Sequence, residues 1–213
     1  MNRRALAVAI LAGGRARRLG GVNKGALEIG GAAIVDRQLA VLRSVASDIF
    51  VVGGPDPLWT ARGLRVVPDD ITGAGPLGGI YTALVHSPAE RTLVVGCDMP
   101  FLAADVLHRL ASIDDADVVV ARSDRGVEPL CAVYSRACAA EIRERLARGA
   151  YEASTLPAGV RVVEVGVDRA LVFLNVNTPH DYERAKGLVE RQPEPDEDRI
   201  TTGRARPMTD PAS

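Results

Sequence analysis

The sequence predicts an α/β domain built on a mostly parallel sheet, and three observations support this prediction. Short apolar runs alternate along the chain with longer segments whose apolar residues lie three and four positions apart, which is the pattern of consecutive strand and helix units. Hydrophobic residues make up 47% of the chain and charged residues 25%, as in water-soluble globular proteins. A chain of 213 residues is long enough for one such domain with a full core.

The expected strands are the short apolar runs. The first, ALAVAILA at 5–12, follows two arginines and superficially resembles a signal peptide. Because the run is short and leads into glycines and arginines, we interpret it as a buried first strand. The later strands are expected at 49–53, 64–67, 92–97, 117–121, 130–134, 161–165 and 171–176.

Amphipathic segments between these runs are the expected helices. The start of the last one is well marked, because Thr178 is a suitable N-cap, Pro179 suits the first helical position and Asp181 lies in the first turn. After residue 190 the chain is rich in Pro, Asp, Arg and Thr. We therefore expect a folded domain over 1–190 and a disordered tail over 191–213. The helices are expected at 34–46, 76–86, 103–111, 136–147 and 179–189.

Net charge and cysteine content argue against several kinds of partner and site. A formal net charge of -1 gives no general attraction to nucleic acid or to a membrane, so neither is an expected partner. The three cysteines include no CxxC pair and have no histidine at zinc-ligand spacing, which argues against a disulfide framework or a structural metal site. A reducing cytoplasm is the expected location.

The stretch LAGGRARRLGGVNKG at 11–25 combines glycines with basic side chains directly after the first expected strand. In an open parallel sheet, ligands bind beyond the carboxyl ends of the strands. Gly13 and Gly14 would let backbone N–H groups approach a phosphate closely. The stretch matches neither GxxxxGK[ST] nor GxGxxG, and its alternative interpretation is a glycine turn with solvated arginines. The side chains that would add positive charge are Arg15, Arg17, Arg18 and Lys24.

Carboxylates follow two other expected strands. Asp98 comes directly after TLVVGC, and a hard carboxylate facing a polyphosphate suits Mg²⁺. Asp69 and Asp70 follow another strand and precede a glycine-rich loop that would fit against a base or ribose. The alternatives are that Asp98 is an N-cap and that the glycine-rich loop is a plain connection.

Together these segments resemble the molybdenum cofactor guanylyltransferases. The motifs are LAGGRARRLGGVNKG, PDD followed by GPLGGI, GCDMPF, EPLCAVY and FLNVNTPHDYERA, in this order across residues 8–185. The resemblance implies a three-layer α/β/α, Rossmann-like fold of the nucleotide-diphospho-sugar transferase type. It also implies that GTP and Mo-molybdopterin are converted to Mo-molybdopterin guanine dinucleotide and pyrophosphate, with Mg²⁺ as cofactor and with molybdoenzyme apoproteins or their chaperones as further partners.

The resemblance also implies roles for individual residues. Lys24 would contact the phosphates, Asp69 the ribose or base, and Asp98 both GTP and Mg²⁺. The residues expected to contact the nucleotide are Leu11, Ala12, Gly13, Gly14, Lys24, Asp69 and Asp98. Those expected to take part in catalysis are Arg18, Lys24 and Asp98.

Asn175 and Asn177 match the late motif associated with the acceptor. In the expected strand they would project to one face, with Val176 on the other. The alternative is that both asparagines cap the helix that follows or hold a neighbouring loop.

One position departs from the family pattern, and other functions stay open. Where relatives carry an asparagine after the second strand, this chain has Gly53 and Gly54, so a base contact there has to come from the backbone. LAGG in place of LAAG favours GTP over CTP. The alternatives are cytidylyl transfer to molybdopterin, nucleotidyl transfer to a sugar phosphate, and a nucleotide-binding adaptor that delivers the cofactor without turnover.

Overall fold

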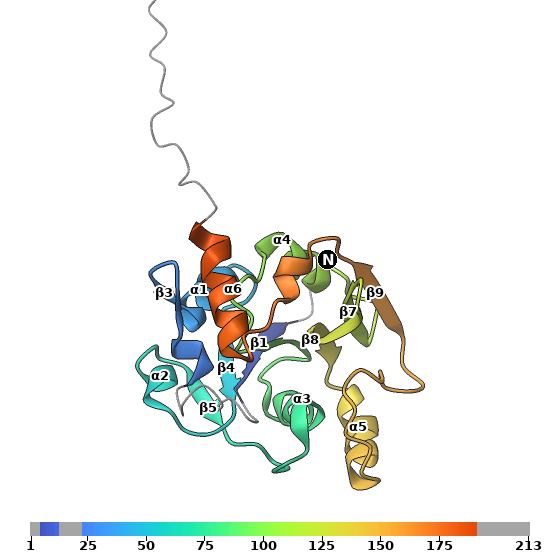
Figure 1. The fold of residues 1–213 in the computed structure, drawn as a ribbon. Helices are drawn as coiled ribbons and strands as arrows, with labels where there is room; N and C mark the ends of the chain where they lie inside the picture. Colours follow the sequence, from blue (N-terminus) through green and yellow to red (C-terminus); the bar gives the residue numbers. More distant parts are fainter. Residues whose placement is uncertain (1–4, 13–22, 191–213) are drawn as a thin grey trace, which may run out of the picture.

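The computed structural model describes residues 5–12 and 23–190 (Figure 1). The strands are β1 (Leu6–Leu11), β2 (Glu28–Ile29), β3 (Ala32–Ala33), β4 (Ile49–Val52), β5 (Arg65–Val67), β6 (Arg91–Gly96), β7 (Val118–Ser123), β8 (Gly126–Ser135) and β9 (Val162–Gly166). The α-helices are α1 (Ile34–Leu42), α2 (Pro57–Thr60), α3 (Gly75–His86), α4 (Ala104–Ala111), α5 (Cys138–Ala147) and α6 (Pro179–Glu190). Two 3₁₀ helices are η1 (Lys24–Ala26) and η2 (Ala170–Phe173).

Within the described ranges, seven strands form one sheet in the order β5-β4-β1-β6-β8-β7-β9. Only β8 runs antiparallel to its neighbours, and the other pairs are parallel. The predicted α/β class with a mostly parallel sheet is therefore confirmed. The carboxyl ends of β4, β1 and β6 lie next to one another, which is where an open α/β sheet binds ligands.

The central strand β1 is buried on both faces, as expected for a parallel strand covered by helices. Val8 and Ile10 belong to the core on one side, while Ala7, Ala9 and Leu11 belong to the core on the other. Helices α1 and α4 cover the first face, and α3 and α5 cover the second (Figure 1). This gives the three layers that the resemblance implied.

Strands β7 and β8 pair as a hairpin that was not predicted, and together they extend beyond the two apolar runs that predicted the strands. The register shifts after Val120, so that Ala121 pairs with Glu128 whereas Val120 pairs with Ala132. Pro129 lies in this irregular stretch, where a residue without an N–H group is tolerated. Irregularities of this kind redirect side chains, and Leu130 lines the cleft described below.

The strand expected at 171–176 is absent, and this prediction was wrong. Residues 170–173 form η2, and residues 174–177 continue without regular structure to α6. The run is apolar because Val172, Phe173 and Val176 are buried beneath helices, and a short apolar run does not distinguish a strand from other buried segments. The start of α6 was predicted correctly, since Thr178 Oγ1 accepts a hydrogen bond from Asp181 N–H at 3.1 Å.

The β2–β3 ribbon and helix α2 were not predicted from the sequence. Each of these three elements has four residues or fewer, too few for hydrophobic periodicity to show. The tail expected at 191–213 lies outside the described residues. None of the helices that the structure describes is long and apolar enough to cross a membrane.

Candidate functional site

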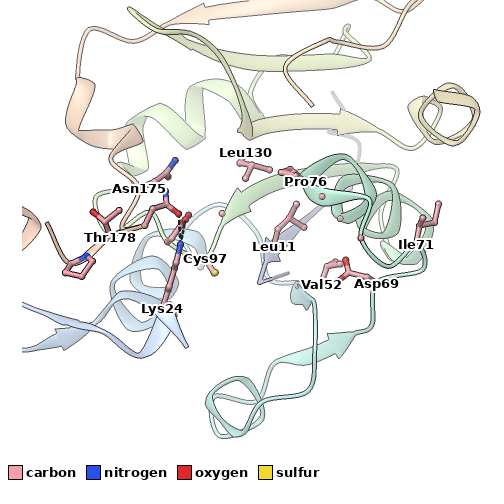
Figure 2. A pocket seen from close by; sticks show the side chains of 17 residues that line it. Leu11, Lys24, Val52, Asp69, Ile71, Pro76, Cys97, Leu130, Asn175 and Thr178 are labelled. Carbon is pink, nitrogen blue, oxygen red and sulfur yellow. Dashed lines mark hydrogen bonds and ion pairs between the residues drawn. The ribbon is translucent and has the colours of Figure 1, made fainter. Parts of the chain in front are cut away.

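A cleft of about 1010 Å³ opens at the carboxyl ends of β4, β1 and β6. Figure 2 shows Lys24, Asn175 and Thr178 at one end of it and Asp69, Val52 and Ile71 at the other, with Leu11 and Leu130 between them. Its described lining consists of Leu11, Lys24, Val52, Asp69, Ile71, Gly73, Gly75, Pro76, Gly79, Gly96, Cys97, Asp98, Leu130, Asn175, Asn177, Thr178 and Pro179. Every predicted site residue that the structure describes, except Ala12, therefore lines one cleft.

Asp98 lies in the turn that follows β6, where the chain leaves the sheet. Burial raises the pKa of its carboxyl group, and the nearby Lys24 ammonium acts in the opposite direction. Space for the carboxylate depends on Gly96, because a Cβ atom there would lie 2.9 Å from Asp98 Oδ1. The Asp98 carbonyl accepts a hydrogen bond from Val176 N–H at 2.9 Å, which joins this turn to the segment before α6.

Lys24 is buried although it is charged, with 6% of its surface exposed. It begins η1, whose N-cap Asn23 accepts a hydrogen bond from Gly25 N–H at 3.0 Å. Asn23 in turn donates to Asp56, the N-cap of α2. The Lys24 ammonium reaches Asp98 Oδ2 at 3.5 Å and Asn177 Oδ1 at 2.5 Å, so it is a fixed positive charge at one end of the cleft.

The two asparagines share the cleft even though they do not lie in a strand. Val176 between them is fully buried in the core, whereas Asn175 and Asn177 both line the cleft. Asn177 accepts the hydrogen bond from Lys24, and Asn175 Oδ1 is buried without a hydrogen-bond partner among the described residues. Both asparagines line the same cleft, but the strand that was predicted for them is absent. Helix capping is performed by Thr178 and Asp181.

Asp69 lies at the opposite end of the cleft from Lys24 (Figure 2). Its carboxyl pKa is raised by burial first and then by repulsion from Asp70. Asp70 has a different environment, since its carboxylate contacts His86 Nε2 at 3.0 Å. Between the two ends, α3 approaches β1 closely: a Cβ atom on Gly79 would lie 3.0 Å from Leu11 Cδ1. The start of α3 therefore contributes Gly75, Pro76 and Gly79 to the cleft wall, and the two glycines leave it without a side chain at their positions.

Five predicted site residues of the glycine-rich basic stretch are not among those that the structure describes. Gly13, Gly14, Arg15, Arg17 and Arg18 lie outside the described residues.

Ala12 is half-buried, and its N–H donates to the Val52 carbonyl at 2.8 Å. At the position that departs from the family pattern, Gly53 N–H donates to the Val67 carbonyl at 2.9 Å. That N–H group is thus already engaged.

Leu130 and Ile71 line the cleft and were not predicted. Leu130 lies in the segment EPLCAVY, which carried the resemblance but received no role. Hydrophobic residues that border a ligand site cannot be told from core residues by periodicity alone. Cys97 beside Asp98 is buried and also borders the cleft, and burial raises the pKa of its thiol to about 12.

The donor set at the cleft suits a cation that keeps most of its own ligands. The described residues contain no group of three or more His, Cys, Asp or Glu side chains placed to hold a metal ion. Asp98 supplies a single carboxylate with 18% of its side-chain surface exposed. Mg²⁺ binds through one or two carboxylates together with waters and substrate phosphates. The site therefore fits Mg²⁺ bound with a nucleotide and does not fit a fully protein-coordinated metal.

Comparison with known proteins places the chain among nucleotidyltransferases. Residues 8–163 match the model of the MobA-like NTP transferase domain. A probable molybdenum cofactor guanylyltransferase of Pelotomaculum thermopropionicum is 38% identical over 85% of this chain and 92% of its own length. The molybdenum cofactor guanylyltransferase of Desulfosudis oleivorans is 33% identical over 85% of this chain and 94% of its own length.

Solved structures agree with this placement. Molybdopterin-guanine dinucleotide biosynthesis protein A of Archaeoglobus fulgidus superposes with a TM-score of 0.72 at 26% identity, covering 87% of this chain and 99% of that protein. A 2-C-methyl-D-erythritol 4-phosphate cytidylyltransferase of Thermus thermophilus has a TM-score of 0.61 at 16% identity, covering 85% of this chain and 98% of its own. The second likeness concerns the fold alone.

Proposed function

The chain belongs to the MobA-like NTP transferase family, and on that premise we propose that it transfers GMP from GTP to Mo-molybdopterin. The products are Mo-molybdopterin guanine dinucleotide and pyrophosphate. One observation carries the proposal: Lys24, Asp98 and Asn177 come from three distant segments and meet at one end of a cleft at the carboxyl ends of the parallel strands.

The reaction needs positioning and charge neutralisation more than covalent chemistry. The terminal phosphate of molybdopterin attacks the α-phosphate of GTP, and pyrophosphate leaves. No nucleophilic side chain is required, because the acceptor itself supplies the attacking oxygen. Lys24 is a buried, oriented ammonium group and would neutralise phosphate charge more effectively than a mobile surface lysine.

Two further roles follow from the arrangement of the cleft. We propose that Asp98 holds Mg²⁺, which when bound neutralises negative charge on the triphosphate. Asp69 lies at the far end, beside Ile71 and Val52, where a carboxylate and apolar surface would fit a ribose hydroxyl and the face of a base. The triphosphate would then run from Asp69 toward Lys24.

The acceptor would enter beside the segment before α6. Asn175 and Asn177 offer amide donors and acceptors there, and Asn175 Oδ1 lacks a protein partner among the described residues. Such groups suit the amide-rich edge of a pterin or its phosphate. We also propose a cytoplasmic location, because all three cysteines are free and buried, as in proteins of a reducing compartment.

The test is to incubate the protein with Mg²⁺, each of the four NTPs in turn, and Mo-molybdopterin, and to detect the dinucleotide by mass together with released pyrophosphate. We expect product with GTP only, and none when Mo-molybdopterin or Mg²⁺ is left out. Turnover with CTP would replace the guanylyl assignment by a cytidylyl one. Pyrophosphate release with sugar phosphates, or GTP binding without turnover, would overturn the proposed function.

A further inference from the structure

Gln38 is a polar residue on the buried face of α1. That helix buries Ile34, Val35, Leu39 and Leu42 against the sheet, and Gln38 lies among them with 1% of its surface exposed. A buried polar group lowers stability unless it is hydrogen-bonded. The bonds that Gln38 makes therefore explain why an amide occupies a core position.

Both bonds go to the backbone around Asp98. Gln38 Nε2 donates to the Gly96 carbonyl at 2.7 Å and to the Met99 carbonyl at 3.0 Å. Gly96 is the last residue of β6 that pairs with β1, so the carbonyl groups beyond it have left the sheet and need other partners. One NH₂ group thus holds the residues on each side of Cys97 and Asp98.

A third bond completes this arrangement. The Asp98 carbonyl accepts from Val176 N–H at 2.9 Å, so the carbonyl groups of Gly96, Asp98 and Met99 are all engaged. Gln38 Oε1 has no hydrogen-bond partner among the described residues, and the opposite orientation of the amide would place its oxygen against two carbonyl oxygens. The side chain is therefore used as a donor at the cost of an unsatisfied acceptor.

We propose that Gln38 is a positioning residue for Asp98, setting the turn so that the Asp98 carboxylate faces the cleft and Lys24. This inference rests on the proposed function, in which Asp98 acts on the bound nucleotide. Gln38 is not itself among the residues that line the cleft, and it acts through the backbone of Gly96 and Met99 that it holds. Residues that orient a metal ligand typically change metal affinity or activity by about 10- to 100-fold when they are replaced.

The test compares Gln38→Met with Leu42→Ala. Methionine keeps the length of the side chain but removes the donor, while Leu42, fully buried one turn further along the same helix, gives a matched loss of core stability. We expect Gln38→Met to lower kcat by about 10- to 100-fold and to raise the half-saturating Mg²⁺ concentration, with the KM for GTP close to that of the wild type. Leu42→Ala should lower the melting temperature and leave kcat unchanged.

A second measurement does not depend on turnover. Hydrogen exchange at the amides of Cys97 and Val176 should be faster in Gln38→Met than in Leu42→Ala at equal global stability. If Gln38→Met does not fold, Gln38→Asn is used in its place, because its shorter amide cannot reach both carbonyl groups. The same measurements then test the proposal.

Unchanged kcat and exchange, or an equal loss of kcat in Leu42→Ala, would overturn the proposal. Absence of transfer in the wild type would overturn the proposed function instead, and the exchange data would still decide whether Gln38 holds the turn.

Discussion

Acidic residues at the cleft differ from those at the β9 edge of the sheet in how their charge is compensated. At the cleft, burial raises the pKa of Asp69 and Asp98. On β9, a hydrogen bond from Arg122 lowers the pKa of Glu164. Burial disfavours the charge of the cleft acids, even though Asp98 contacts Lys24, whereas the exposed edge acid is paired with Arg122. Acidic groups whose pKa is raised by burial in a cleft are typical of functional sites.

The topology explains this contrast. On the parallel side of the sheet, consecutive strands bring their carboxyl ends and the turns after them to one place. On the other side β8 runs in the opposite direction, so its own carboxyl end lies away from the cleft. That half contributes Leu130 from the irregular part of the hairpin and the segment before α6. In that half of the sheet, Arg122 on β7 and Glu164 on β9 form an ion pair with each other.

The largest effect is expected from Asp98→Asn, which removes the carboxylate and keeps its shape. Transfer should fall about 100-fold or more, because a preorganised charged group at the reacting centre is lost. The measurements are dinucleotide synthesis at saturating GTP and the Mg²⁺ dependence of the rate. If a soluble, folded variant synthesised the dinucleotide at the wild-type rate, Asp98 would have no role in transfer. The comparison between the cleft and the β9 edge would then have no functional meaning.

Lys24→Ala should have the next largest effect. A hydrogen bond to a charged group contributes about 1.5–3 kcal/mol, so kcat/KM for GTP should fall about 10- to 100-fold. The control is Lys186→Ala, since Lys186 lies on α6 and pairs only with the neighbouring Glu183 among the ion pairs of the described residues. Equal activity of the two variants would show that the buried lysine serves the fold and not the nucleotide.

Asn177→Ala tests the acceptor end of the cleft. Loss of one neutral hydrogen bond to the acceptor corresponds to about a 2- to 10-fold increase in the KM for Mo-molybdopterin. The KM for GTP should rise less, because Lys24 loses its bond to Asn177 but keeps its contact with Asp98. Asp181→Ala is the control for a structural role, because it removes the cap of α6 and should lower the melting temperature alone. If Asn177→Ala lost GTP binding and acceptor binding equally and also melted at a lower temperature, the segment before α6 would have only a structural role.

Asp69→Asn should reveal the unfavourable charge at the other end of the cleft. A carboxyl group whose pKa is raised on folding destabilises the native state once the unfolded chain ionises. The variant should therefore melt at a higher temperature than the wild type at pH 7, and the difference should disappear as the pH falls below the ordinary value of 3.8. Thermal melts across this pH range measure it. A lower melting temperature at pH 7 would contradict the assignment of the raised pKa to burial and Asp70.

The smallest effect is expected at the β9 edge. Arg122 and Glu164 form an exposed ion pair, and such pairs contribute little because water and salt screen them. Glu164→Gln should lower the melting temperature slightly at low salt, by less at high salt, and leave transfer unchanged. The comparison would fail if this variant reduced transfer as strongly as a substitution at the cleft.

Much of the fold was predictable because its signals are local. The apolar runs located seven of the strands, and the cap, Pro179 and Asp181 located the start of α6. The run at 171–176 misled because burial beneath helices and burial in a sheet both favour apolar residues. Asp69 and Asp98 were predicted as site residues because carboxylates follow strand ends, and Lys24 because it belongs to the glycine-rich basic stretch, whereas Leu130 gives no such signal. Gln38 does give a signal in the sequence, because it is a glutamine on the apolar face of an amphipathic helix.

The sequence by itself determined most of the strands and helices and which chemical groups follow the strand ends, because periodicity and capping act over a few residues. Only the tertiary structure decided the reversed direction of β8, the contact of Lys24 with Asn177 across 153 positions in the chain, and the reach of Gln38 to both sides of Asp98. Strand direction and long-range contacts depend on how whole elements pack, and the free energy that selects them is shared among many distant residues.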